Sequence, residues 1–485
     1  MSQGKKIASG LRWNIVDTVA VKGVGFFIIL LLTRLLTPED FGILSIVMVF
    51  TTVGTAIIEG GLGMSLIRDN EANSLDYSTI LISNVVISLL VYGVVYLIAP
   101  WVALFFDEPK ITDLLRVLGL NFIIMSLSVV QTSILMKEMD FKTLTISTFP
   151  SNVIGGGVAI WAAYTGAGVW SLVILPLVTQ TCRSFLLFIL SKWKFKFQFS
   201  KLKFKKHLLF GYRLVLSTIL NTLFMELYSL LIGKQFSVTT LGYYSRARVF
   251  TFFPVNIIGS VISNVSYPML ANMQSKKKEV TIQYQKILKS SFFLLAGLMV
   301  TLHVIAEPLF LWLFTETWAE FIPYFKIMCL SVVLVPIHEI NLNVFKVFDR
   351  TDLLLKIEIF KKFLIAMVLA VGYFWDIKTM LWVMVATGYI SLYINSYYAG
   401  KIINYPTSQQ LIHMLPTFLA AIFVGFLGYY VDSLIVNAHL IIRILSLGVL
   451  TVSMYLAISY FIKNDGLSEL IILAKKLIQI DKKQG

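Results

Sequence analysis

The chain has 485 residues, of which 57% are hydrophobic and only 14% charged, and its mean hydropathy is +0.81. Because ordinary soluble domains carry about 25% charged residues, this composition excludes a soluble globular protein. It predicts an all-α, polytopic membrane protein. The formal net charge of +15 indicates no nucleic-acid partner, since basic loops beside anionic membrane lipids account for it.

Windows of about twenty apolar residues predict fourteen membrane-spanning helices. In chain order they cover residues 13–36, 41–66, 78–105, 112–136, 143–165, 168–190, 208–233, 241–270, 287–314, 320–345, 353–375, 379–399, 411–431 and 438–462. The fifth span is the weakest, because Pro150 and the run Gly155-Gly156-Gly157 interrupt it. We expect a break there, which only protein or a water-filled cavity can accommodate.

The landmarks of the first unit return about two hundred residues later. Gly10, Arg12, Arg34 and Gly42 reappear at offsets of 200 or 201 as Gly211, Arg213, Lys234 and Gly242. Lys137 and Asp140 return at an offset of 209 as Lys346 and Asp349. Six predicted spans separate the copies, so both start on the same side of the membrane. Such a parallel repeat is typical of two-lobed transporters with a pathway between the lobes.

We therefore expect four segments. Residues 1–190 form an N-terminal lobe, 191–207 a basic linker, 208–399 a C-terminal lobe, and 400–485 two further spans with a tail. In the linker, lysines alternate with Trp193, Phe195 and Phe197. A solvated linker is the expected form, and a short amphipathic strand or a segment lying on the membrane surface is the alternative.

Lysine and arginine set the predicted orientation. They gather in the N-terminal segment, the 191–207 linker, 273–289, 346–362 and the C-terminus, whereas the intervening loops carry acidic residues such as Asp107, Glu108 and Glu316. The positive-inside rule places both termini in the cytoplasm.

Four short motifs resemble one family. They are Arg34-Leu-Leu-Thr-Pro-Glu-Asp-Phe-Gly42, Leu241-Gly-Tyr-Tyr-Ser-Arg-Ala247, Ser266-Tyr-Pro268 and Phe314-Thr-Glu-Thr-Trp318. Their order and positions resemble Wzx-type polysaccharide exporters of the multidrug/oligosaccharidyl-lipid/polysaccharide (MOP) superfamily, in the branch of colanic acid and amylovoran exporters. The resemblance implies a flippase in the bacterial inner membrane that exports an undecaprenyl-pyrophosphate-linked oligosaccharide. It also implies a polysaccharide polymerase and co-polymerase as partners.

Ionisable residues inside spans are the candidate site. Each costs about 2.5–3.5 kcal/mol on insertion scales and rarely faces lipid. Substrate-binding candidates, which would meet the pyrophosphate, are Lys22, Arg213, Arg246 and Arg248; ion-coupling candidates are Asp17, Glu59 and Glu226. Most lie in spans that line the cleft between lobes in the resembling family.

Each candidate also has a structural interpretation. Asp17 and Lys22 are about 140° apart around a helix and are poor partners. Glu59 suits a helix-end charge, and Arg213 could snorkel to the interface. Because Arg246 and Arg248 lie about 200° apart, at most one is expected to face the cleft, and the motif favours Arg246. Outside this set, Arg183 and Arg443 are expected to be helix-end charges, and His338 a proton relay or a core histidine.

Enzyme signatures are scarce. The chain has no GxxxxGK phosphate loop, and Cys182 and Cys329 lack metal-ligand spacing. We expect no cofactor and no resident metal. One enzymatic interpretation survives, a membrane glycosyltransferase or polymerase with a metal-binding pair at Glu39 and Asp40. The other alternative is a cation-coupled drug exporter, whose cleft would be mainly acidic. Without ATP, the expected drive is the membrane potential, inward flow of H⁺ or Na⁺, or both.

Topology gives the first test. A reporter fused after Lys201 should be cytoplasmic, and reporters inserted near Glu108 or Glu316 should be external. Paired alkaline phosphatase and fluorescent-protein fusions measure the side directly. An external reporter at Lys201 would contradict the lobe assignment.

Overall fold

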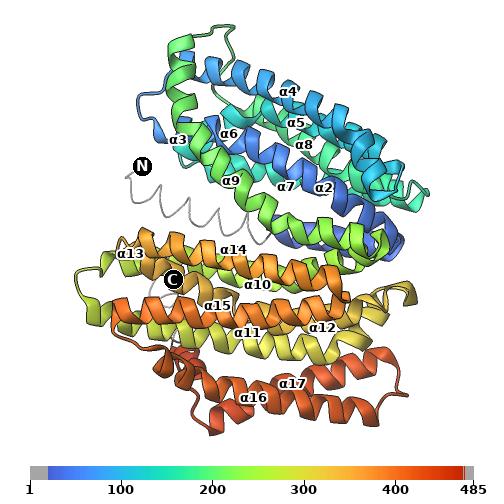
Figure 1. The fold of residues 1–485 in the computed structure, drawn as a ribbon, viewed down its shortest axis with the longest axis vertical. Helices are drawn as coiled ribbons and strands as arrows, with labels where there is room; N and C mark the ends of the chain where they lie inside the picture. The colour runs from blue at the N-terminus through green and yellow to red at the C-terminus, as the bar shows by residue number, and fades with distance from the viewer. Residues whose placement is uncertain (1–19, 473–474, 476–485) are drawn as a thin grey trace, which may run out of the picture. The chain divides into compact units, whose positions relative to one another are not determined.

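A computed structural model describes residues 20–472 and residue 475. They form two compact units that divide the chain between Ser245 and Arg246. Figure 1 shows helices throughout, and the described residues contain no β-strand. The all-α prediction is therefore confirmed.

The first unit begins with a helix that includes residues 20–35. It continues with α2 (Pro38–Gly60), α3 (Leu62–Arg68), α4 (Ser74–Phe106), α5 (Lys110–Ser126), α6 (Val129–Lys137), α7 (Phe141–Tyr164), α8 (Trp170–Leu190) and α9 (Lys201–Gln235). The predicted linker is partly helical, because α9 starts at Lys201 and only residues 191–200 lie outside helices. Helix α9 packs against α2, α3 and α4 of the first unit, whereas the predicted C-terminal lobe begins within this helix, at residue 208. The lobe boundaries stay a prediction.

The second unit contains most of α10 (Val238–Asn272), which starts in the first. It continues with α11 (Lys277–Leu313), a 3₁₀ turn η1 (Glu316–Trp318), α12 (Phe321–Val332), α13 (Val335–Val347), α14 (Thr351–Phe374), α15 (Ile377–Ile403), α16 (Thr407–Leu434) and α17 (Leu440–Phe461). In its described residues, each of the fourteen predicted spans coincides with a helix or a consecutive helix pair, and residues 13–19 of the first span lie outside the described residues. Among the described residues, nine candidate spans are long and apolar enough to cross a membrane, and the bent pair α5–α6 makes a tenth. The chain is a multi-pass membrane protein.

The expected break in the fifth span is wrong. Helix α7 runs without interruption through Pro150. A Cβ on Gly155 would overlap Thr179 Oγ1, and a Cβ on Gly156 would overlap the side chain of Ile28. These glycines therefore let neighbouring helices approach α7 closely and do not interrupt it.

The fourth and tenth predicted spans each divide into two helices, but among the described residues only the fourth bends there by more than 40°. The first divides between Ser126 and Val129 into α5 and α6, and the second between Val332 and Val335 into α12 and α13. Each is followed by a turn containing a non-glycine residue of positive φ, Met139 in one case and Asp349 in the other. The two spans hold equivalent positions in the sequence repeat, but the second predicted span also divides, at Gly61 between α2 and α3, whereas its counterpart α10 is continuous.

Two repeat landmarks meet directly in the first unit. A Cβ on Gly42 would overlap the carbonyl oxygen of Val238, and a Cβ on Gly242 would overlap the carbonyl oxygen of Pro38. Gly42 and Gly242 are 200 residues apart, and so are Pro38 and Val238. This spacing is expected of two copies of one motif. The starts of α2 and α10 can touch backbone to backbone only because both positions are glycine.

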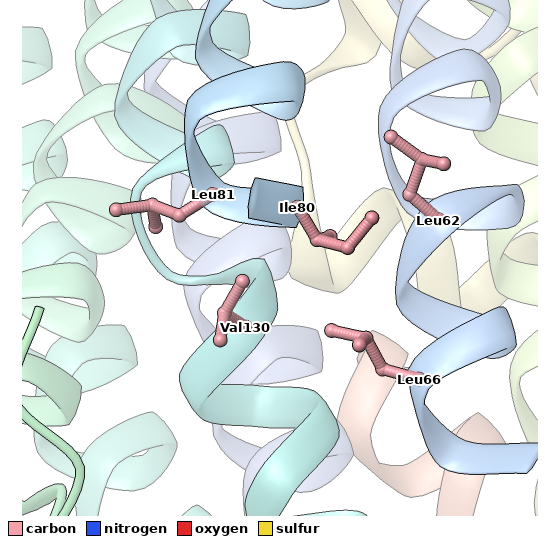
Figure 2. Packing of buried hydrophobic residues seen from close by; sticks show 5 residues of the cluster. All are labelled: Leu62, Leu66, Ile80, Leu81 and Val130. Carbon is pink, nitrogen blue, oxygen red and sulfur yellow. The ribbon is translucent and has the colours of Figure 1, made fainter. Parts of the chain in front are cut away.

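Buried hydrophobic residues hold α3, α4 and α6 together where the α8–α9 connection lies. Figure 2 shows this cluster, which comprises Leu62, Leu66, Ile80, Leu81 and Val130. Trp193 and Phe204 pack against it from the connection and from α9. We call this end of the first unit the linker end.

Substitution of Gly42 or Gly242 tests the reciprocal contact. Gly42→Val or Gly242→Val should sharply reduce folded protein, because a backbone carbonyl cannot move aside as a flexible side chain can. Gly93→Ala is the matched control, because a Cβ there meets nothing within 4 Å and mid-helix Gly→Ala should stabilise by roughly 0.5–1 kcal/mol. Yield and melting temperature in detergent are the measurements. Equal tolerance at all three positions would contradict the close approach.

Candidate functional site

Two predicted charges lie near the crossing of α2 and α9. A Cβ on Gly211 would come within 2.8 Å of the Gly61 backbone, so the helices are in close contact there. Glu59 and Arg213, two residues from these glycines, are both exposed. Arg213 Nε donates to Tyr212 Oη at 3.1 Å. Neither charge forms an ion pair with another described residue, so both remain accessible to a ligand.

The other predicted charges of the first unit differ in environment. Lys22 is exposed on the helix over residues 20–35, whereas Asp17 lies outside the described residues. Glu226 is half-buried in α9 and accepts a hydrogen bond from Ser229 Oγ at 3.2 Å. Lys22 therefore lies on the surface of the described residues, and Glu226 has a polar neighbour.

In the second unit, Arg246 and Arg248 follow each other on α10. Arg246 is only 7% exposed, and Arg248 is half-buried. The guanidinium of Arg246 therefore does not face open solvent in this conformation. Contact with a ligand would require α10 or its neighbours to move.

A polar cluster at the linker end was not predicted. His207 is fully buried at the start of α9, with Nδ1 2.7 Å from Ser65 Oγ and Nε2 3.2 Å from Asp76 Oδ1. An ionised carboxylate only accepts, so Nε2 donates to Asp76 and Ser65 can donate to Nδ1. Lys203 Nζ lies 2.5 Å from Asp76 Oδ2. One buried carboxylate thus joins α4 to α9.

A second carboxylate extends this cluster. Lys206 Nζ lies 2.6 Å from Asp69 Oδ2, and Lys137 Nζ donates to the Asp69 carbonyl oxygen at 2.5 Å. The Lys206 hydrogen bond lowers the pKa of Asp69 from its usual value. Stability from this pair is therefore present above the pKa of the unfolded carboxyl and is lost as pH falls through the lower, folded value.

The cluster also has the composition of a cation site. Ligand atoms of Asp69, Asp76 and His207 lie within 4.8 Å of one another. The ammonium groups of Lys203 and Lys206 already contact the two carboxylates, so a divalent ion would have to displace both. The contacts favour a structural ion-pair cluster. Three acidic residues close together, Asp69, Glu71 and Asp76, in a connection predicted to be cytoplasmic were the available sequence signal, but the positive-inside rule considers only Lys and Arg.

The acidic pair Glu39 and Asp40 has structural roles. Asp40 Oδ2 accepts from the Thr37 amide at 3.0 Å and from its hydroxyl at 2.8 Å, completing a capping box at the start of α2. Glu39 lies 3.6 Å from Lys110 Nζ. These contacts account for both carboxylates without a metal and weaken the glycosyltransferase interpretation.

Other predicted polar residues of the second unit stabilise helix packing. His338 Nδ1 lies 2.9 Å from Asn395 Nδ2, which is the arrangement of a core histidine. Arg443, only 5% exposed, forms a two-point ion pair with Asp432, with Nε–Oδ1 and Nη2–Oδ2 distances of 3.0 Å. This pair joins α16 to α17.

The second unit also holds an apolar cavity of about 270 Å³. Its walls come from α11, α12, α15 and α16 and include Met299, Val333, Phe418 and Ile422. Such walls cannot satisfy the hydrogen bonds of a sugar or the charge of a pyrophosphate. The headgroup of a lipid-linked sugar therefore does not belong in this cavity.

Long apolar helices and a sequence repeat whose landmark glycines meet define a polytopic membrane protein built from two related copies. The chain belongs to the polysaccharide biosynthesis protein family, which matches residues 31–323. It is 23% identical over 378 residues to the lipopolysaccharide biosynthesis protein WzxC of Escherichia coli K12, covering 77% of this chain and 76% of that protein. It is 22% identical to the teichuronic acid biosynthesis protein TuaB of Bacillus subtilis 168, covering 72% and 73%. The resemblance to Wzx-type exporters is confirmed.

Solved structures share the fold. The lipid II flippase MurJ, in an inward closed conformation, matches with a TM-score of 0.74 at 14% identity, covering 94% of this chain and 99% of MurJ. An inward-facing multidrug transporter of the MATE family and the MOP superfamily matches with a TM-score of 0.59 at 15% identity, covering 81% and 94%. The fold is that of the MOP superfamily.

Neutralising Asp76 tests the cluster at the linker end. Asp76→Asn should destabilise the protein by on the order of 3 kcal/mol, because it leaves the ammonium of Lys203 without its charge partner in a mostly buried site. Glu39→Gln is the control, because its pair with Lys110 is about half exposed and should contribute less than about 1 kcal/mol. Melting in detergent measures both. Similar shifts for the two variants would contradict a stabilising role of the cluster.

Proposed function

We propose that this protein is an alternating-access flippase that exports an undecaprenyl-pyrophosphate-linked oligosaccharide for surface polysaccharide synthesis. The family match over residues 31–323 carries the proposal. The names of the relatives place them in lipopolysaccharide, succinoglycan and teichuronic acid biosynthesis. A lipid-linked precursor is the substrate that such pathways need moved across a membrane.

The extent of the fold match favours a lipid-linked substrate over a drug. The lipid II flippase matches 94% of this chain, but the MATE transporter matches 81%. The difference between these two coverages of the chain corresponds to about the length of two spanning helices with their connections. The transporter fold that this chain matches more completely is thus the one whose substrate is a lipid.

The candidate cations suit an anionic headgroup. In the proposed mechanism, Lys22 and Arg213 meet the pyrophosphate, because both are exposed and neither would have to leave an ion pair. Arginine adds charge-assisted, two-point hydrogen bonds to phosphate oxygens. Of the two arginines on α10, Arg246 contributes after α10 has moved, and Arg248 is the alternative. An anion leaving bulk water recovers its lost hydration through such contacts.

The proposed drive is electrical, ionic or both. Export of an anion from an inside-negative cytoplasm gains about 2.3 kcal/mol per charge per 100 mV. Inward H⁺ or Na⁺ coupling would act through Asp17, Glu59 or Glu226, since neutralising a carboxylate in a membrane span changes its desolvation free energy. The protein would lie in the bacterial inner membrane with both termini in the cytoplasm, delivering substrate to a polymerase and co-polymerase.

Loss of the gene gives the cellular test of this function. The proposal expects a deletion strain to lose surface polysaccharide and accumulate lipid-linked oligosaccharide inaccessible to external glycosidase. Unchanged polysaccharide together with increased sensitivity to cationic dyes would instead favour the drug exporter.

Reversing the charge of Arg246 tests the cationic site. Arg246→Glu should reduce export more than Arg246→Gln, because repulsion of the pyrophosphate adds to the lost attraction. The measurement is recovery of surface polysaccharide in the deletion strain at matched membrane protein level. Equal recovery by the Gln and Glu variants would remove Arg246 from the substrate site.

A further inference from the structure

The connection between α8 and α9 combines positive charge with aromatic side chains. Lys192, Lys194 and Lys196 alternate with Trp193, Phe195 and Phe197, and Phe199 follows just before α9. We call residues 192–202 the basic–aromatic segment. The part that precedes α9 forms neither helix nor strand, so the amphipathic strand considered from the sequence is absent from this described stretch.

Both ends of the basic–aromatic segment are fixed to α4. Trp193 Nε1 donates to Ser74 Oγ at 3.2 Å, and its ring meets the Tyr77 ring edge-on at 5.9 Å between centroids. At the other end, the Ser200 amide donates to Thr79 Oγ1 at 3.1 Å. The segment is therefore held in place, and a freely solvated linker does not describe it.

This fixed segment leaves large apolar side chains exposed. Phe197 is 87% exposed, Leu202 80%, Phe199 53% and Phe195 37%. The rings of Trp193, Phe195 and Phe197 form a continuous row, with centroid separations of 6.4 and 6.2 Å. Presenting such a row to water is unfavourable by about 25 cal/mol per Å² of apolar surface, so the row is expected to be covered in the working protein.

The surface continues from a membrane-spanning helix. The last turns of α8 expose Phe185, Phe188, Ile189 and Leu190, and α8 is apolar enough to cross a membrane. The basic–aromatic segment therefore begins where the chain leaves the hydrocarbon. Aromatic side chains concentrate at this depth of the bilayer.

The positive charges of the segment favour anionic over neutral lipid headgroups. Lys192, Lys194 and Lys196 are exposed and make no ion pair with any other described residue. Clusters of such lysines next to a spanning helix attract anionic phospholipid headgroups. Exposed rings beside unpaired lysines give the surface both features of an interfacial membrane anchor.

We propose that residues 192–202 form an anionic-phospholipid docking surface that seats the α8–α9 connection in the bilayer interface. The rings of Phe195, Phe197 and Phe199 enter the headgroup region, and the neighbouring lysines contact phosphate. Since Ser200 and Lys203 attach this connection to α4, lipid bound here would restrain the start of α9. This inference does not depend on the transported substrate.

Spin-label accessibility in vesicles tests the docking. A label is placed at Phe197→Cys in a background of Cys182→Ser and Cys329→Ala, and its collisions with oxygen and with a water-soluble nickel complex are compared. The control is a label at Glu71→Cys, an exposed loop residue at the same end. On vesicles containing phosphatidylglycerol, we expect the oxygen-to-nickel accessibility ratio at 197 to be at least threefold that at 71.

The second part of the experiment tests the contribution of the lysines. Replacing Lys192, Lys194 and Lys196 with Gln, or raising the salt to about 1 M to screen them, should lower the ratio at 197 on anionic vesicles. Vesicles of phosphatidylcholine alone should give a lower ratio than anionic ones. Elution volume and melting temperature check that each labelled protein is folded.

Two results would overturn the proposal. A label at 197 as accessible to nickel as the label at 71 on anionic vesicles would show that the row stays in water, and would assign it to a protein partner instead. A high ratio unaffected by lipid charge, salt and the Gln substitutions would show an apolar anchor without selection for anionic lipid.

Discussion

The carboxylate of Asp76 is the contact on which the linker end depends. It holds Lys203 at 2.5 Å and His207 at 3.2 Å, and both partners lie in the first two turns of α9. A buried carboxylate needs such partners, because its charge is otherwise expensive to remove from water. These contacts attach the start of α9, which directly follows residues 191–200, to α4.

Glycine has the corresponding role where helices must approach closely. Gly42 and Gly242 bring the starts of α2 and α10 together, and Gly61 and Gly211 do the same for α2 and α9. In a membrane, where hydrophobic burial drives helix association weakly, close backbone packing is a main source of contact energy. The landmarks of the sequence repeat are thus also positions at which a side chain would not fit.

The helices were largely predictable from sequence, because an apolar run of about twenty residues has few alternatives to a spanning helix. The division of three spans into α2–α3, α5–α6 and α12–α13 was not predicted, and the break between Ser126 and Val129 contains no helix-breaking residue that could have signalled it. The fifth span shows the opposite error, because Pro150 and three glycines suggested a break in what is a continuous helix. In both cases, the helices that pack against a span determine whether it forms one continuous helix or two. A single sequence does not show which helices those are. The sequence alone does not predict how buried the candidate charges are, because burial depends on tertiary packing, as the difference between exposed Lys22 and buried Arg246 shows.

Cations and carboxylates in this chain therefore fall into two groups. Asp76, Asp432 and Arg443 are paired and hold helices together, whereas Lys22, Glu59 and Arg213 are exposed without ion-pair partners among the described residues. In the proposed mechanism, the two cations of the second group, Lys22 and Arg213, meet the transported anion. The most direct test is transfer of a fluorescent undecaprenyl-pyrophosphate oligosaccharide across vesicles containing this purified protein and no other. We expect transfer to depend on the protein. A membrane potential that is negative on the cytoplasmic side should accelerate it, because such a potential drives an anion outward. Absence of transfer by folded protein, under every polarity and ion gradient, would contradict the proposed function.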